Sequence, residues 1–265
     1  MGLQGCRAVR SSSSGADLNV VCLKWGTLYD ARYVNNLYRM VSRHLSRPFR
    51  FICFTDDSAG LLSDVEVYAL PEFEEPDWQY ARYCSAWRKL ALFDSTLANM
   101  RGKVLFLDLD VVIVDSIDCI ASFAAPFAMI ENWYQPGRQA GQASVMCFDV
   151  GYPESLLHRY RDNPVAVLER YRTEQAYIAS ELGERRCTFF PDAWCKSFKK
   201  HCLPTGIRRF WQSPKAIPGG ARIMVFHGRP NPPDAIEGVW GKKLPWYKRW
   251  YKRIKPCPWV AQHWC

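Results

Sequence analysis

The chain lacks any long apolar run. No stretch of its 265 residues approaches the roughly 18 uninterrupted apolar residues that a membrane-spanning helix needs. The first residues, MGLQGCRAVRSSSSGADLN, lack the apolar core of a signal peptide, and Cys6 stands where a myristoylation signal has Ser or Thr. We therefore expect residues 1–18 to be a disordered lead-in and the protein to be cytoplasmic.

The chain also lacks an internal repeat and a regular set of cysteines. Its eleven cysteines are odd in number and widely spaced, and no secretion signal accompanies them, so we expect reduced thiols rather than a disulfide framework. Cys187, Cys195 and Cys202 cluster loosely with His201. Their spacing is not that of a zinc knuckle or ribbon, which argues against a structural zinc site.

Acidic residues are missing from the C-terminal end. From Gly238 onward there are seven Lys or Arg and no Asp or Glu, whereas the preceding part carries 28 basic and 26 acidic residues. Residues 246–253, WYKRWYKR, would place Trp246 and Trp250 on one helix face and basic residues on the other. This pattern favours peripheral contact with an anionic membrane, or packing of the tryptophans on the domain; single-stranded nucleic acid is the least favoured partner.

The apolar pattern predicts an α/β fold. A helix at 31–45 follows the first strand and precedes the second, with short connections, which predicts a mostly parallel sheet flanked by helices. Further helices are expected at 83–97 and 154–181, the second interrupted near Asn163-Pro164, and residues 132–143 are expected to form a loop. The expected strands are 20–24, 49–54, 65–70, 104–107, 126–130, 144–148, 187–190 and 222–226.

Two aspartates follow the most apolar of these strands, in KVLFLDLDVVIVDSID at residues 103–118. Alternate residues of an extended chain point the same way, so Asp108 and Asp110 would present two carboxylates side by side. Like charges held that close repel, and Mg²⁺ or Mn²⁺ suits such oxygen ligands. A solvated turn after a strand is the alternative interpretation.

Two other strands deliver polar residues to the same expected edge. Lys24, Trp25, Gly26 and Thr27 follow the first strand, and His227-Gly228-Arg229 follows the last. Ligands of parallel sheets bind at the carboxyl ends of the strands, so the three segments together predict a binding site.

At these positions the sequence resembles the nucleotide-sugar glycosyltransferases that carry an Asp-x-Asp motif, the family of glycogenin and the bacterial lipopolysaccharide galactosyltransferases. The matching stretches span about residues 19–237 and occur in the family's order: KWGTLY, FICFTDD, WRKLALF, VLFLDLDVVIV, SVMCFD, EQAYI and VFHGRPNP. The resemblance implies a single GT-A domain, Rossmann-like, at 19–237, followed by a basic aromatic tail at 238–265. It also implies a bacterial hexosyltransferase with a UDP-sugar donor, a glycan or lipid-linked acceptor, and Mn²⁺ or Mg²⁺.

The resemblance also assigns roles to single residues. Asp108, Asp110 and His227 would hold the metal ion, and either Lys89 or Arg88, with Lys89 the better positional match, would contact the donor. The full set of residues implied to bind the donor and its metal is Lys24, Trp25, Gly26, Thr27, Lys89, Asp108, Leu109, Asp110, Gly228 and Arg229. A divalent ion between the two phosphates would neutralise the charge that develops on the leaving group.

Two departures from the family fall where the transferred sugar would lie. Gln142-Ala143 stands where relatives carry Asn-Ser, and Glu174-Gln175 stands where they carry Asp-Gln. The resemblance implies a catalytic role for Gln175 with Asp108 and Asp110, and retention of anomeric configuration. Front-face attack assisted by the leaving phosphate accounts for retention without the covalent nucleophile of the alternative route.

Two other functions fit parts of the sequence. Asp108 and Asp110 after an apolar strand also match the opening motif of haloacid-dehalogenase-type phosphatases. That motif normally follows the first strand, whereas about a hundred residues precede it here. A non-catalytic membrane- or nucleic-acid-binding protein that acts through its tail is the alternative from another class.

Overall fold

A computed structural model describes residues 17–74, 84–241 and 254–265 of the chain. The expected lead-in therefore lies outside the described residues up to position 16, and so does the basic aromatic segment 246–253. The cysteines for which the structure gives a bonding state are all free thiols, as expected: Cys22, Cys53, Cys119, Cys147, Cys187, Cys195, Cys202, Cys257 and Cys265.

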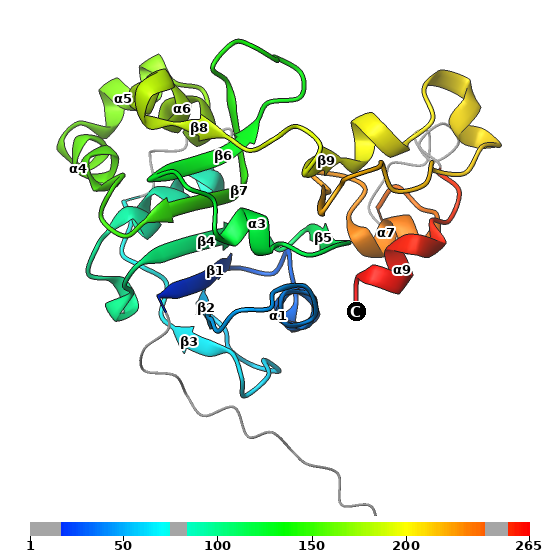
Figure 1. Ribbon diagram of the computed structural model, residues 1–265, viewed down its shortest axis with the longest axis horizontal. Coiled ribbons are helices and arrows are strands. Elements are labelled where there is room, and N and C mark those ends of the chain that lie inside the picture. Colours follow the sequence, from blue (N-terminus) through cyan, green and yellow to red (C-terminus); the bar gives the residue numbers. More distant parts are fainter. Residues whose placement is uncertain (1–16, 75–83, 242–253) are drawn as a thin grey trace, which may run out of the picture.

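A seven-stranded sheet forms the larger part of the molecule (Figure 1). Its strands lie in the order β3 (Glu66–Tyr68), β2 (Arg50–Thr55), β1 (Leu18–Lys24), β4 (Lys103–Leu107), β7 (Gly141–Asp149), β6 (Phe127–Glu131) and β8 (Thr188–Phe189). Only β7 runs antiparallel to its neighbours β4 and β6. All seven residues of β1 are buried, as expected for a central parallel strand covered on both faces. The expected mostly parallel α/β sheet is confirmed.

Helices cover both faces of this sheet. On one face lies α1 (Ala31–His44), whose apolar stripe, including Val34, Leu37 and Val41, packs into the core with β1 and β4. Asp30 begins this helix by accepting a hydrogen bond from the Arg32 amide. The other face is covered by η2 (Arg88–Phe93), α4 (Glu154–Asp162) and α6 (Glu174–Arg186). The described residues contain no helix that is both long and apolar enough to cross a membrane.

A second, three-stranded sheet was not expected. It consists of β5 (Val111–Ile113), β10 (Ile223–Val225) and β9 (Cys195–Ser197), in that order. Figure 1 shows β9, α7 (Pro232–Glu237) and α9 (Pro258–His263) gathered in a lobe beside the large sheet, with β5 reaching toward it. The last strand before His227 therefore belongs to this small sheet and not to the edge of the large one.

The predicted helices are more broken than expected. The described part of the region, 84–97, contains α2 (Cys84–Trp87) and the 3-10 turn η2, and a further turn, η3, begins at its end and covers Leu97–Asn99. The Asp94 carboxylate accepts hydrogen bonds from the Thr96 amide and hydroxyl, a local pairing that competes with helical bonds. The region 154–181 divides at Asn163 and again before Thr173, which caps α6, and gives α4, α5 (Pro164–Arg170) and α6. The loop expected at 132–143 ends early, because β7 begins at Gly141.

The described end of the chain packs on the body. Trp264 is buried, and its ring meets that of Tyr33 edge-on with centroids 5.2 Å apart. Arg43 of α1 donates to the carbonyl oxygens of His263 and Cys265, each at 2.7 Å. Over residues 254–265, the expected tail is thus part of the folded molecule.

Candidate active site

The tripeptide Asp108-Leu109-Asp110 connects the two sheets. The Asp108 amide donates to the Ser144 carbonyl at 2.9 Å, which ties it to β7 of the large sheet. The carbonyl of Asp110 accepts from the Phe226 amide at 3.1 Å, just beyond β10 of the small sheet. Leu109 points into the core and is 2% exposed. Backbone bonds and one buried side chain thus fix the two carboxylates at the junction of the sheets.

A lysine neutralises the first carboxylate. The Lys89 Nζ lies 2.8 and 2.9 Å from the two carboxylate oxygens of Asp108 and donates to the Ala143 carbonyl at 3.2 Å. It also lies 3.9 Å from the buried carboxylate of Glu174. Burial alone would lower the pKa of Lys89, but the charges of Asp108 and Glu174 outweigh it, and the pKa is raised. Lys89 is therefore a charged ammonium held between two acidic groups.

The second carboxylate is buried. Asp110 is 7% exposed and accepts a hydrogen bond from the Tyr29 hydroxyl at 3.0 Å. Burial and the charge of Asp108 raise the pKa of Asp110 to about 7, against the opposing effects of the Tyr29 hydrogen bond and Lys89. Two carboxylates share this site, and the pKa of Asp110 lies well above the ordinary value of an aspartate. Such strongly shifted groups are typical of functional sites.

The segment after β1 is tied to the loop after β2. Lys24 is buried, and its Nζ donates to the Asp57 carbonyl oxygen at 2.9 Å. The Gly26 amide, at a positive φ of 60°, donates to the Asp56 carboxylate at 2.9 Å. The Thr27 side chain is exposed, whereas Trp25 is half-buried and packs against the core. Lys24 and Gly26 therefore hold the loop, Thr27 is accessible to a ligand, and Trp25 is accessible in part.

His227 reaches the same junction, but its ring is hydrogen-bonded to Ser197. Because β10 and β5 are antiparallel with Val225 opposite Val111, continuing the register places His227 opposite Leu109. The imidazole Nε2 lies 2.7 Å from the Ser197 hydroxyl, and the ring stacks on Trp133 at a centroid distance of 5.6 Å. Burial, with the charge of Lys199, lowers the pKa of His227 to about 4, so the ring is neutral at physiological pH. A neutral imidazole is the form that binds metals.

Arg229 and Gly228 complete this segment. The Arg229 guanidinium pairs with the Asp234 carboxylate at 3.0 Å, and the same carboxylate accepts from the Asn231 amide at 2.9 Å. Arg229 thus stabilises the start of α7 in this structure. Gly228 has a φ of 70°, a conformation that favours glycine.

Gln175 lies near the lysine and aspartates. Its amide oxygen accepts from the Ala143 amide at 3.4 Å, the residue whose carbonyl bonds Lys89. The preceding Glu174 is buried against Lys89. The side chain of Gln142 pairs with Ser144 instead, through its amide oxygen and nitrogen. The helix α6 therefore places Glu174 and Gln175 close to Lys89 and Asp108.

The donor set fits a hard divalent cation in part. Asp108 and Asp110 offer carboxylate oxygens whose mutual repulsion a cation would relieve. His227 does not stand beside them as a third ligand, since its ring bonds Ser197. In the part of the chain that the structure describes, no three His, Cys, Asp or Glu side chains stand close enough together to hold a metal ion. Metal binding here requires oxygens from a substrate, a movement of His227, or both.

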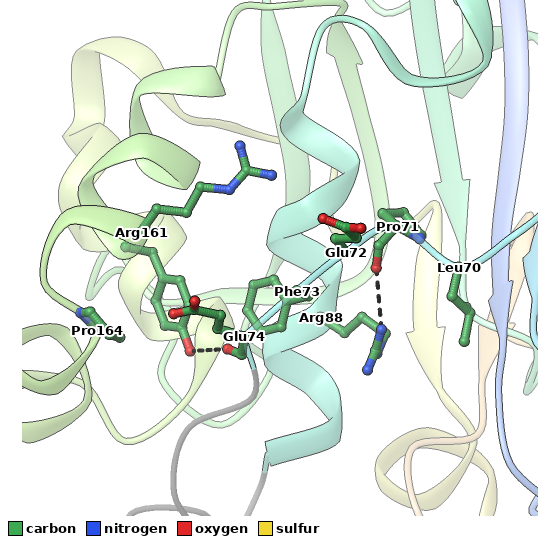
Figure 2. Close-up of a pocket in the computed structure, with 9 residues that line it drawn as sticks. Leu70, Pro71, Glu72, Phe73, Glu74, Arg88, Arg161 and Pro164 are labelled. Carbon is green, nitrogen blue, oxygen red and sulfur yellow. Dashed lines mark hydrogen bonds between the residues drawn. The ribbon is translucent and has the colours of Figure 1, made fainter.

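Arg88 points to a different place from Lys89. Figure 2 shows its guanidinium donating to the Pro71 carbonyl, at 3.3 Å, within a cavity of about 850 Å³. This cavity is lined by Leu70, Pro71, Glu72, Phe73, Glu74, Arg88, Tyr160, Arg161 and Pro164. Of the two basic residues proposed to contact a donor, the structure places Lys89 at the aspartates and Arg88 in this separate cavity.

Comparison with known proteins supports the fold. No protein-family model matches the chain, and no curated protein matches it significantly in sequence. One similar solved structure is the galactosyltransferase LgtC in complex with donor and acceptor sugar analogs, at a TM-score of 0.54 and 11% identity, covering 81% of this chain and 88% of LgtC. Another is an active-site mutant of LgtC, also at 0.54 and 11%, covering 87% and 99%. The predicted GT-A fold, with its mostly parallel mixed sheet, is confirmed.

Several residues of the site have no clear signal in the sequence. Ser197 and Trp133, which hold His227, belong to no recognisable motif. Tyr29 lies in the KWGTLY stretch, but its bond to Asp110 depends on how the loop closes. Glu174 stands in the EQAYI stretch, but its place beside the buried ammonium of Lys89 depends on how α6 packs.

Proposed function

We propose that this protein is a metal-dependent glycosyltransferase that moves a hexose from a UDP-sugar to a glycan or lipid-linked acceptor with retention. The observation that carries the proposal is the Asp108-Leu109-Asp110 tripeptide, which backbone bonds to both sheets hold at their junction, where the charge of Asp108 acts on the buried Asp110. The fold shared with LgtC supports it. The phosphatase alternative is less favoured, because the motif follows β4, an interior strand of the sheet, rather than the first strand.

The protein's own residues supply binding and charge. Asp108 and Asp110 would hold Mn²⁺ or Mg²⁺, with His227 as a further ligand after its ring leaves Ser197. When bound, the ion would neutralise the charge that builds on the diphosphate leaving group. Tyr29 favours the ionised form of Asp110 through its hydrogen bond, which suits Asp110 to bind a cation.

Lys89 positions the first carboxylate and keeps the site close to electrical balance. Its positive charge lies between the carboxylates of Asp108 and Glu174 and offsets the repulsion between them. Gln175, adjacent to Glu174, would face the transferred sugar. Because Glu174 is buried against Lys89, it is poorly placed as a covalent nucleophile, which favours front-face attack on the sugar.

The nucleoside would lie over the segment after β1. Thr27 is exposed and Trp25 is half-buried beside the backbone of Gly26, which Asp56 fixes in place. The part of the indole that is not packed on the core suits stacking on a base, and the exposed hydroxyl suits a ribose.

Peripheral contact with the inner face of a membrane is part of the proposal. It rests on the WYKRWYKR sequence at 246–253, outside the described residues, and on the acid-free stretch that follows Gly238. The test is co-sedimentation with vesicles containing anionic lipid. Replacing Lys248, Arg249, Lys252 and Arg253 by Gln should abolish binding, and equal binding of both forms would reject the contact.

A thermal-shift screen tests the transferase itself. Nucleotides and nucleotide sugars are compared with and without Mn²⁺, and UDP or a UDP-sugar is expected to raise the melting temperature only with the metal. The shift should disappear in Asp110→Ala. No response to any uridine nucleotide at any Mn²⁺ concentration would reject the proposal.

A further inference from the structure

Lys199 lies at the junction of the sheets although no motif includes it. It belongs to η4 (Phe198–Cys202), the turn that follows β9 directly. Strands β9 and β10 are parallel, with Ser197 opposite Val225, so the residues after them leave the small sheet at the same edge. The bond between Ser197 and His227 is one result of this arrangement.

The Lys199 ammonium lies directly over Gly228. A Cβ atom built on Gly228 would be 3.2 Å from the Lys199 Nζ, tighter than most contacts of a Cβ atom. The same charge reaches the neighbouring His227, where it adds to the effect of burial in lowering the pKa. The lysine is half-buried and therefore has both a fixed place and access to solvent. The backbone of the His227-Gly228 segment thus has a cation beside it.

Arg229, which the family resemblance implies to bind the donor, forms an ion pair with another residue of the chain. Its guanidinium pairs with Asp234, which is buried and also caps α7 through the Asn231 amide. Moving Arg229 toward a phosphate would leave that buried carboxylate without its counter-charge, which is costly. A phosphate at this edge would therefore need another cation.

We propose that Lys199 is a phosphate-binding residue of the donor site. Its ammonium contacts a phosphate oxygen of a nucleoside diphosphate bound beside Asp108, Asp110 and His227. An ammonium is a compact charge that suits this role, and Gly228 leaves room for it. This inference rests on the proposed transferase function and adds a residue that the family motifs do not contain.

The test compares UDP binding by matched lysine variants. Isothermal titration calorimetry with UDP and Mn²⁺ is run on the full chain and on Lys199→Met, Lys199→Arg and Lys196→Met. Lys196→Met is the control: it removes the same charge three residues away, where Lys196 pairs with the exposed Asp192. Melting temperatures of all variants are measured alongside, so that a folding defect is recognised.

Loss of a charge-assisted contact predicts UDP binding about tenfold weaker or more in Lys199→Met. Lys199→Arg should stay within about threefold of the unmodified chain, since it keeps the charge. Lys196→Met should change binding less than about twofold, because the partner of Lys196 is the exposed Asp192 and not the His227-Gly228 segment. UMP should lose less affinity than UDP on Lys199→Met, since it lacks the second phosphate.

Two results overturn the inference, and they are distinguishable. If the unmodified chain binds UDP and Lys199→Met binds it as well as Lys196→Met does, Lys199 does not contact the phosphates, while the transferase proposal stands. If the unmodified chain binds no UDP with Mn²⁺ present, the transferase proposal fails and this inference fails with it. Weaker binding by Lys199→Met that Lys199→Arg restores confirms the contact.

Discussion

The ammonium of Lys89 lies 2.8 Å from a carboxylate oxygen of Asp108, and the lysine is only 9% exposed. The chain contains a second Lys–Asp pair at the same distance, Lys103 with Asp149, in which both partners are more exposed, at 25% and 48%. The two pairs have the same residue types and the same separation. Because the first pair is more buried, comparing the loss of each lysine shows how burial changes the contribution of such a pair to stability.

Removing the buried lysine should destabilise the fold strongly. Lys89→Met leaves Asp108 and Glu174 close together without a counter-charge, which should cost roughly 3 kcal/mol of unfolding free energy. Lys103→Met is the control and should cost less than about 1 kcal/mol, because its pair is exposed to solvent. Urea unfolding measures both, and equal losses would contradict the structural role given to Lys89.

The raised pKa of Asp110 predicts a dependence of stability on pH. Between its ordinary value of 3.8 and about 7, the folded chain keeps a proton on Asp110 that the unfolded chain has lost. Folding therefore binds a proton in this window, and the contribution of Asp110 to stability falls as pH rises through it. The isosteric Asp110→Asn variant does not titrate, so it should gain stability relative to the unmodified chain between pH 4 and pH 8.

Melting temperature against pH measures this effect in both proteins. A gain of 1 kcal/mol corresponds to roughly 2 to 4 °C in a chain of this size. The difference between variant and unmodified chain should grow with pH and level off above about pH 7. A difference that is constant across the range would show that Asp110 has an ordinary pKa.

The Tyr29 hydroxyl should tune metal binding. Its hydrogen bond to Asp110 lowers the pKa of that carboxyl, so Tyr29→Phe should raise the pKa further and leave fewer molecules with the ionised ligand. Loss of a hydrogen bond to a metal ligand typically costs about tenfold or more in metal affinity. Tyr68→Phe, which changes a tyrosine of β3 that bonds Arg50, is the control. Mn²⁺ titration in the presence of UDP measures the metal affinity of both variants. If Tyr29→Phe binds Mn²⁺ as tightly as Tyr68→Phe does, Tyr29 does not contribute to the metal site.

The end of the chain should contribute to stability. Trp264 is buried against Tyr33, so Trp264→Ala should lower the unfolding free energy by about 3 kcal/mol. Trp211→Ala is the control, because that indole is 60% exposed and its loss should cost less than about 0.5 kcal/mol. If Trp264→Ala is as stable as the control, α9 does not belong to the folded body in solution.

The sequence predicts the large sheet well, but of the small sheet it predicts one strand, β10, and neither β5 nor β9. Apolar runs such as Val104–Leu107 are long and buried on both faces, and that signal depends only on local residues. The strands β5, β9 and β10 are three residues each, and β10 pairs with β5 from about a hundred positions away and with β9 across a shorter but still non-local separation. A three-residue apolar run gives no indication of which sheet it will join.

The sequence indicates which motifs contribute to the site, but not which side chains pair with one another there. The Asp-x-Asp spacing and the strand before it place Asp108 and Asp110 at a sheet end. The family resemblance of the preceding segment implies that Lys89 belongs to the same site. The orientation of His227 toward Ser197 and the commitment of Arg229 to Asp234 depend on side-chain geometry in the second lobe. Sequence spacing carries no information about which partner a side chain selects when two are within reach.

The most direct test of the account is whether Mn²⁺ and UDP bind cooperatively at the two aspartates. Among the described residues, the structure brings together two of the predicted metal ligands, Asp108 and Asp110. Mn²⁺ binding should therefore be weak without UDP and should strengthen when a diphosphate supplies further oxygens. Electron paramagnetic resonance of free Mn²⁺ measures the dissociation constant with and without UDP, against UDP and Mn²⁺ mixed without protein. The account predicts that UDP tightens Mn²⁺ binding about tenfold or more in the unmodified chain and not in Asp108→Asn or Asp110→Asn. Equal Mn²⁺ affinity with and without UDP, or the same response in these variants, would contradict it.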